Sequence, residues 1–147
     1  MHLYILELEG GHYYVGVARD VGLRLWQHFK MGNRTGSAWT KKHKPISVIH
    51  ISEITNPTKR RYEAIEQEAV LRIAKAVGFE KVRGAGYTTS SDEVPKTWLH
   101  LLDDVPPADF TKMTPPTKKE LAELMKGKYE IWRADMKKYR KPKPHTD

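Results

Sequence analysis

The chain of 147 residues contains no cysteine, which excludes disulfide bonds and thiolate metal sites. It also has no apolar run approaching the roughly 20 residues that a helix needs to cross a bilayer. Glu7 and Glu9 interrupt the N-terminal segment, where a secretory signal would be apolar. A chain without disulfides needs no oxidising compartment, so we expect a cytosolic setting.

Several signatures of other enzyme classes are missing as well. The sequence has no glycine-rich phosphate loop ending in Gly-Lys-Ser/Thr, no dinucleotide fingerprint and no paired-histidine metal motif. Its seven histidines are scattered. A small-molecule substrate is therefore not expected.

Positive charge is in excess. The chain carries 26 Lys and Arg against 18 Asp and Glu, a net charge of +8. A basic surface concentrates polyanions around a protein and speeds its encounters with them. Nucleic acid is the favoured partner and an anionic membrane the weaker one, while a surface that only maintains solubility is the structural alternative.

A strand, a glycine turn and a second strand are predicted at the N-terminus, at residues 2–8, 9–11 and 12–18. The loop length decides which side chains share a face of the sheet. A two-residue loop would place Tyr4 and Tyr14 on opposite faces, whereas a three-residue loop pairs Leu6 with Tyr14 and puts both tyrosines on one face with Gly16. A shared tyrosine site therefore requires an odd-length loop or a bulge.

The next elements follow from helix signals and apolar periodicity. We predict a helix from an Asp20 cap to about Met31, a loop over 32–44, a third strand over 46–54 and a long helix over 58–77, which Gly78 ends. Val21, Leu25 and Phe29 should face the core on the first helix. The apolar stripe of the long helix consists of Tyr62, Ile65, Ala69, Ile73 and Val77.

The composition changes after Tyr87. A polar stretch over 88–92 precedes a short helix opened by Pro95, and a link over 105–116 contains four prolines. Thr117 and Glu120 form a capping-box signature for a last helix, in which Gly127 is a weak point. The tail over 141–147 is expected to be disordered. This division predicts one domain over residues 1–88 and a basic helical extension over 89–147.

Residues of several types occur in a fixed order in the first half of the chain. Leu3-Tyr4-Ile5 is followed by Tyr14-Val15-Gly16, by Arg24 and His28 four residues apart, and by the segment EAIEQEAVLR on the long helix. Over residues 3–87 this pattern resembles the GIY-YIG endonucleases, with Leu3 where glycine is common and Val15 where isoleucine is common. Taken singly, each residue also has a structural explanation in strand packing, helix solvation or an ion pair.

The resemblance implies a role for each residue. Tyr4 would orient or deprotonate the attacking water, Tyr14 would hydrogen-bond the phosphate or the nucleophile, and Arg24 would neutralise the phosphate oxygens. His28 would contact phosphate or assist proton transfer. Glu68 would hold the single Mg²⁺ or Mn²⁺ ion of the site, with Glu63 and Glu66 as competitors for that position.

A second set of residues is expected to contact nucleic acid. Basic side chains bind phosphates, and an aromatic ring can stack on a splayed base. The structural alternative is a solvated loop with Trp39 in the core. Gly36 to Thr40 and Val82-Arg83-Gly84 also resemble a bacterial and phage branch of the family, and Lys81 stands near the place of a family asparagine. The set comprises Arg34, Ser37, Trp39, Thr40, Lys41, Lys42, Lys44, Lys81 and Arg83.

The segment 126–143 carries eight basic and two acidic residues between Tyr129, Trp132 and Tyr139. It is either a second DNA-contacting element or a helix whose aromatics pack on the catalytic domain. The alternative to both is an interaction protein whose last helix docks a partner.

Together these observations predict an α/β (α+β) fold, with a small antiparallel three-stranded sheet flanked by helices and a helical C-terminal extension. The expected activity is metal-dependent endonucleolytic hydrolysis of DNA. The alternative is a nucleic-acid-binding module that kept the fold and lost catalysis. The substrate's shape, the biological pathway and the oligomeric state stay open.

Overall fold

The computed structural model describes residues 1–31, 37–87 and 96–139. The predicted helix stop at Gly32, the predicted phosphate contact Arg34, the polar stretch 88–92 and the tail 141–147 lie outside these residues. No helix within the described residues is long and apolar enough to span a membrane.

A four-stranded mixed sheet forms the centre of the molecule, in the order β3-β1-β2-β4. The three longer strands are antiparallel, as predicted. A short fourth strand, which the sequence pattern missed, follows the turn η3 (Phe79–Lys81) and pairs with β2 in parallel. The strands are β1 (His2–Leu8), β2 (His12–Ala18), β3 (Pro45–Glu53) and β4 (Val82–Gly84).

The hairpin between β1 and β2 has a three-residue loop, one of the arrangements that a shared tyrosine site requires. Leu6 pairs with Tyr14, and Tyr4 pairs with Gly16. Gly10 and Gly11 adopt φ values of 75° and 74°, a region that glycine enters without steric cost. The side chains of Tyr4 and Tyr14 therefore lie on the same face of the sheet.

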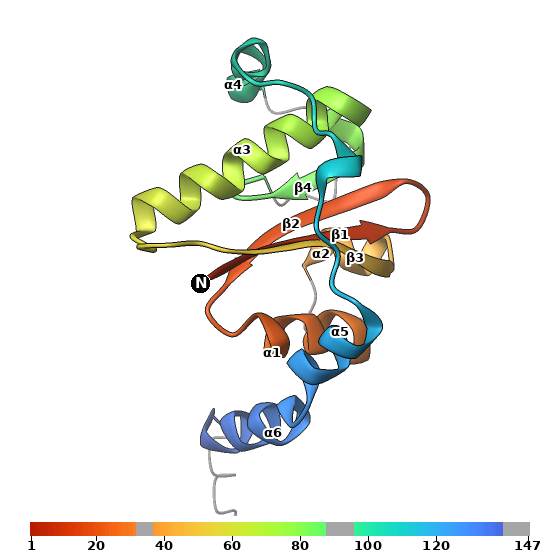
Figure 1. Cartoon of the computed structure of the whole chain (residues 1–147), viewed down its shortest axis with the longest axis vertical. Helices are drawn as coiled ribbons and strands as arrows, with labels where there is room; N and C mark the ends of the chain where they lie inside the picture. Colours follow the sequence, from red (N-terminus) through yellow and green to blue (C-terminus); the bar gives the residue numbers. More distant parts are fainter. Residues whose placement is uncertain (32–36, 88–95, 140–147) are drawn as a thin grey trace, which may run out of the picture.

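Helices cover both faces of the sheet (Figure 1). On one face, α3 (Lys59–Val77) buries Val70 and Ile73 against Leu3, Ile5 and Val15. Thr58 caps its first turn, and it ends at Gly78, with φ 103°, in agreement with the predicted bounds. On the other face lies α1 (Val21–Trp26), which packs on a second core group that contains Tyr4, Leu6 and Leu8.

The helix carrying Arg24 and His28 changes its winding halfway along. Asp20 caps α1, as predicted, and after Trp26 the chain continues as a π-helix, η1 (Gln27–Met31). Single π-helical turns inserted in helices often occur at functional sites. His28 lies within η1, so the change of winding sets the direction of its imidazole.

The prediction of a loop over 32–44 is wrong for its second half. The residues Ala38–Lys42 form a short helix, α2, which Ser37 caps through a hydrogen bond from the Thr40 N–H. Trp39 is completely buried and anchors this helix in the core, where its indole N–H donates to the carbonyl oxygen of Tyr13 at 2.9 Å. Burial of the indole thus stabilises a helix that is too short to form alone.

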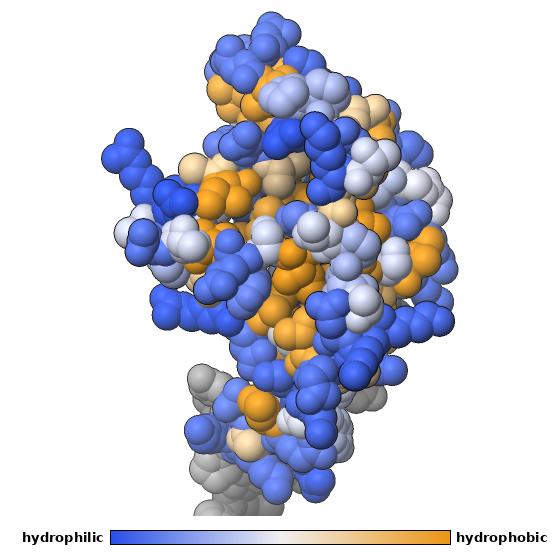
Figure 2. All heavy atoms as spheres, in the orientation of Figure 1, coloured by the Kyte–Doolittle hydropathy of each residue, from blue (hydrophilic) through white to orange (hydrophobic). Residues whose placement is uncertain are grey.

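The C-terminal half returns across the molecule rather than leaving it. After α4 (Lys96–Leu99), η4 (His100–Asp104) and η5 (Phe110–Lys112), the linking segment passes beside β3 toward the opposite face (Figure 1). Backbone hydrogen bonds join Ala108 N–H to the Arg72 carbonyl oxygen at 2.8 Å and Ile51 N–H to the Thr114 carbonyl oxygen at 3.2 Å. In Figure 2 the hydrophobic residues visible on this side gather over the middle of the molecule, within a hydrophilic surface.

Two helices end the described chain where one was predicted. The capping box of Thr117 and Glu120 opens α5 (Lys118–Met125), as expected, but the helix breaks at Gly127, with φ 74°, before α6 (Lys128–Tyr139). Leu121, Leu124 and Met125 pack on the core beneath α1. Among the aromatic residues of α6, Tyr129 and Trp132 stack at an angle on Trp26, with ring centroids 5.8 Å away in both cases.

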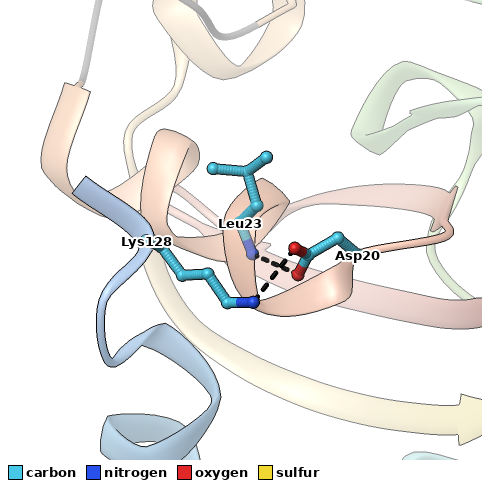
Figure 3. A network of polar contacts seen from close by, with 3 residues as sticks. All are labelled: Asp20, Leu23 and Lys128. Atoms are coloured by element: carbon cyan, nitrogen blue, oxygen red, sulfur yellow. Dashed lines mark hydrogen bonds and ion pairs between the residues drawn. The ribbon is translucent and has the colours of Figure 1, made fainter. Parts of the chain in front are cut away.

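Asp20 connects the extension to the start of α1. Its carboxylate accepts a hydrogen bond from Leu23 N–H at 3.0 Å and forms an ion pair with Lys128, also at 3.0 Å (Figure 3). Partial burial acts to raise the pKa of this carboxyl, but the bonds from Leu23 and Lys128 outweigh it and hold the pKa below its usual value. The same side chain therefore caps α1 and fixes α6.

Gly22 allows the closest contact between α1 and the extension. A Cβ there would lie 1.9 Å from the carbonyl oxygen of Leu124, a backbone atom that cannot move without shifting α5. We expect Gly22→Ala to lower the free energy of unfolding by about 1–3 kcal/mol and to expose the 118–139 segment to proteases. Chemical denaturation and limited proteolysis measure these effects.

The matched control is Gly86→Ala, because nothing lies within 4 Å of a Cβ at Gly86. This variant should match the wild type in both measurements. A Gly22→Ala protein with unchanged stability and unchanged proteolysis would contradict the docking described here.

Candidate active site

Four of the five predicted catalytic side chains gather on the α1 face of the sheet. The Tyr4 hydroxyl and His28 Nε2 are 2.9 Å apart. The ring centroids of Tyr4 and Tyr14 are 6.2 Å apart, and that of His28 is 5.6 Å from Tyr4 and 5.3 Å from Tyr14. Two strands and one helix therefore bring two phenols and an imidazole into a single group.

Arg24 joins this group through its guanidinium. It forms side-chain hydrogen bonds with both Tyr4 and Tyr14, and its Nη1 donates to Gln27 Oε1 at 3.1 Å. Because a guanidinium can only donate, both phenol oxygens accept from it. The hydroxyl hydrogen of Tyr4 is then free to be donated to His28 Nε2.

Burial controls the protonation of Tyr4 and His28. Desolvation, followed by the nearby Tyr14, raises the pKa of Tyr4 well above its usual range, although Arg24 acts to lower it. Burial, and secondarily the charge of Arg24, lowers the pKa of His28 to about 3. At neutral pH the group therefore holds a protonated phenol beside a neutral imidazole that can accept its hydrogen bond.

The exposed fractions set the order in which a ligand meets these residues. Tyr4 is 1% exposed and His28 is 3% exposed, whereas Tyr14 and Arg24 are half-buried. An approaching phosphate therefore contacts Tyr14 and Arg24 first. Tyr4 and His28 lie behind them.

The structure places Glu66, one of the predicted competitors, nearer the tyrosine group than the predicted Glu68. Glu68 is exposed on α3, while Glu66 is half-buried and acts electrostatically on Tyr4. At about 100° per residue, Glu68 lies about 160° around the helix from Glu66. Glu66 shares its side of α3 with Val70 and Ile73, which are 0% and 1% exposed. The face that packs on the sheet therefore carries Glu66 and turns Glu68 to solvent.

Glu66 lies beside the end of β4. Past this point, the edge of β2 that faces away from β1 is not paired with β4. Its carboxylate accepts hydrogen bonds from the backbone N–H groups of Ala85 and Val17. Burial raises its pKa, as does the charge of Glu63, while these two hydrogen bonds lower it, and the net pKa is above the usual value. Val17 directly follows Gly16, over which the Tyr4 ring lies, so the carboxylate reaches the edge of the tyrosine group from the opposite face of the sheet.

Only part of the predicted nucleic-acid contact set is at the surface. Lys41, Lys42 and Lys44 are exposed, and Lys81 is half-buried. Ser37 is also half-buried, but it caps α2. Trp39, Thr40 and Arg83 are buried, at 0%, 6% and 0% exposed, so the structure favours the core interpretation of Trp39 and does not place Thr40 or Arg83 at the surface.

Arg83 has a role that the sequence pattern did not indicate. Its guanidinium lies 4.1 Å from the ring centroid of Trp39 and 4.0 Å from that of Tyr87. It also donates to the carbonyl oxygens of Phe79 and Val82, at 2.6 and 2.7 Å. Arg83 therefore holds α2, β4 and the 85–87 turn together by cation–π contacts and hydrogen bonds, and presents no charge to a ligand.

The described residues contain no group of three or more His, Asp or Glu side chains that could enclose a metal ion. A divalent ion at this site would therefore depend on one carboxylate, Glu66, with water and substrate oxygens completing its shell. Such a shell is normal for Mg²⁺, which keeps several waters and binds through one or two carboxylates plus phosphate oxygens.

Comparison with known proteins agrees with this geometry. The model of the GIY-YIG catalytic domain matches residues 1–72. A UPF0213 protein of Cupriavidus pinatubonensis (strain JMP 134 / LMG 1197) is 36% identical over 76 residues, which cover 51% of this chain and 77% of that protein. No solved structure matches the chain. The chain belongs to the GIY-YIG family and has a nuclease-type fold in its N-terminal half.

The lowered pKa of His28 predicts a pH-dependent stability. The unfolded chain takes up a proton on this residue below about pH 6.5, whereas the folded protein does so only near pH 3. Stability associated with His28 is therefore complete above pH 6.5 and is lost as the pH falls toward 3. At pH 5 the loss should be about 2 kcal/mol.

Denaturation of the wild type and of His28→Gln between pH 7.5 and 4.5 measures this loss, and the variant should show the flatter profile. In NMR spectra the His28 ring signal should not titrate between pH 8 and 5. A His28 signal that titrates near pH 6.5 would refute the buried neutral state.

Proposed function

We propose that this protein is a metal-dependent endonuclease that hydrolyses phosphodiester bonds of DNA. One observation carries the proposal: two phenols, a guanidinium and a neutral imidazole share one hydrogen-bonded group, with the carboxylate of Glu66 at its edge. Phosphodiester hydrolysis needs a phosphate clamp, a group that positions the attacking water and a ligand for a hard cation, and this group offers a candidate for each of them.

Arg24 and Tyr14 would bind the scissile phosphate. Both are half-buried and are reached before the rest of the group. A guanidinium fork matches the geometry of two phosphate oxygens, and the Tyr14 hydroxyl can donate to a third oxygen or hold the attacking water. The net positive charge of the chain favours the approach of DNA.

Tyr4 and His28 would hold the attacking water. The Tyr4 oxygen would accept a hydrogen bond from the water, while the Tyr4 hydroxyl donates to His28 Nε2, 2.9 Å away. Because burial lowers the pKa of His28 to about 3, its neutral ring orients the phenol and does not remove the proton, which passes from the water to solvent. Attack at phosphorus then breaks the bond to the departing oxygen, which takes up a proton from solvent, and the family resemblance points to products with 5′-phosphate and 3′-hydroxyl ends.

Glu66 would hold one Mg²⁺ or Mn²⁺ ion together with waters and a phosphate oxygen. When bound, the ion would withdraw charge from the phosphate and from the departing oxygen. The position suits a cation, because the carboxylate is half-buried and lies near the phenols. One such centre cuts one strand, so cleavage of both strands requires a dimer or two successive events.

The choice between Glu66 and Glu68 gives a direct test. Glu66→Gln should reduce cleavage by at least about 100-fold, because it removes the carboxylate that holds the ion, while Glu68→Gln should cleave like the wild type. The measurement is the rate of cutting of labelled single-stranded, branched and duplex DNA with Mg²⁺ or Mn²⁺.

Arg24→Ala serves as the second inactive variant, and every protein is first checked for the wild-type circular dichroism spectrum. Loss of cleavage in Glu68→Gln and not in Glu66→Gln would reverse the assignment. DNA binding without cutting, with either metal, would instead identify a nucleic-acid-binding module of the same fold, a result consistent with Lys81 near the place of the family asparagine.

Gly16 should be essential for activity although it carries no functional group. A Cβ at this position would lie 2.4 Å from both Cζ and the hydroxyl oxygen of Tyr4, so Gly16→Ala must displace the phenol. A displacement of about 1 Å can reduce a rate by about 100-fold, and we expect a fall of that order in cleavage.

The comparison variant is Tyr4→Phe, which keeps the ring over Gly16 and removes only the hydroxyl. Both variants should lose cleavage and shift the NMR signals of His28, because both remove the Tyr4–His28 hydrogen bond, but only Gly16→Ala should also shift those of Tyr14. Wild-type cleavage by Gly16→Ala would show that the position of Tyr4 is not critical.

A further inference from the structure

A groove of about 950 Å³ opens directly beside Glu66. The first three turns of α3 form one wall, the turn at Ala85 and Gly86 forms the floor, and Trp98 of α4 closes the other side. Glu66 belongs both to this groove and to the edge of the tyrosine group. A chain bound in the groove would therefore lie beside one residue of the candidate active site.

Two aromatic side chains face this groove. Tyr62 and Trp98 line it, and both are half-buried. Trp98 leans on Tyr87 at an interplanar angle of 63° and on Phe79 at 56°. Neither ring lies parallel to the indole, so neither forms a parallel stack with it. A planar ring entering the groove could stack there.

Charged and polar side chains of α3 also line the groove. Lys59 and Arg60 lie at the N-terminal end of α3, and both are exposed. The ion pair of Lys59 with Glu63 measures 3.9 Å between side chains that are 79% and 59% exposed, and such a pair contributes little. Lys59 can therefore exchange this partner for a phosphate. The Gln67 amide offers both a donor and an acceptor to a base edge.

We propose that this groove binds the unpaired nucleotides that flank the scissile phosphate, so that the substrate is DNA with a single-stranded segment at the cut. This inference rests on the proposed function. Trp98 stacks on a base, Arg60 and Lys59 bind the adjoining phosphates, and the strand continues past Gln67 to Glu66. Duplex DNA hides its base faces inside the helix, so only an unpaired nucleotide offers a ring to Trp98.

The dimensions agree with this occupant. A volume of about 950 Å³ is at the upper end for pockets that enclose a small organic ligand. The groove therefore has room for about one or two nucleotides. The groove carries two basic residues at its outer end, two carboxylates, Glu63 and Glu66, and aromatic and amide side chains; basic and aromatic side chains together are typical of proteins that bind single strands without strong sequence preference.

Binding measured in EDTA tests the groove without any cleavage. Fluorescence anisotropy compares a labelled 12-nucleotide single strand with a blunt duplex of the same sequence. Trp98→Leu should weaken single-strand binding about tenfold, because stacking on an aromatic is lost, and should change duplex binding less than twofold. Leu99→Ala, an exposed neighbour on α4 outside the groove, should change neither.

A second readout reports stacking directly. 2-Aminopurine placed at successive positions of the single strand should be quenched at one or two positions by the wild type and by Trp98→Phe, but not by Trp98→Leu. Arg60→Ala covers the case in which Trp98→Leu does not fold, because Arg60 is exposed. It should weaken single-strand binding. It should also reduce by about 1 the slope of the logarithm of the binding constant against the logarithm of the salt concentration.

The outcomes separate this inference from the proposed nuclease activity. Single-strand binding that depends on Trp98 and Arg60, with no cutting at any metal concentration, would support the groove and refute the nuclease. Cutting that requires Glu66 while Trp98→Leu and Arg60→Ala bind single strands like the wild type would overturn the groove and leave the nuclease intact.

Discussion

The packing of the Tyr4 ring on the backbone of Gly16 is the constraint on which the candidate site depends. The two residues are paired across β1 and β2, and the hydroxyl of Tyr4 occupies space that any Cβ at position 16 would enter. This contact exists only because the hairpin loop has three residues. A one-residue change of register would turn Tyr4 and Tyr14 to opposite faces and would remove Tyr4 from His28 and Arg24.

The C-terminal extension packs on α1 and η1, the helix that carries Arg24 and His28. One side of α1 and η1 carries Arg24 and His28 toward the tyrosines, while Gly22 and Trp26 meet α5 and α6 on the other side. Asp20 links the two, since its carboxylate both caps α1 and pairs with Lys128 (Figure 3). The C-terminal segment is therefore placed to hold the helix that carries half of the site.

Buried aromatic and basic residues explain why part of the predicted nucleic-acid surface is internal. Trp39 and Arg83 stand among lysines and glycines in the sequence, a setting also typical of phosphate-binding loops. In the structure the guanidinium of Arg83 lies between Trp39 and Tyr87 and fastens α2 to the edge of the sheet. Composition alone does not separate these uses, because the same side chains serve cation–π packing and nucleic-acid stacking.

Local signals in the sequence determined the three long strands, the Asp20 cap and the bounds of the long helix, since each depends on neighbours within a few residues. A motif of fixed spacing picked out the four side chains that the structure brings together. Tertiary structure alone decided three other features. The strand β4 has only three residues and forms because β2 offers an unpaired edge. The helix α2 exists because Trp39 is buried. The choice of Glu66 over Glu68 follows from the rotation of α3 on the sheet, where burial of Val70 and Ile73 fixes which carboxylate reaches Tyr4.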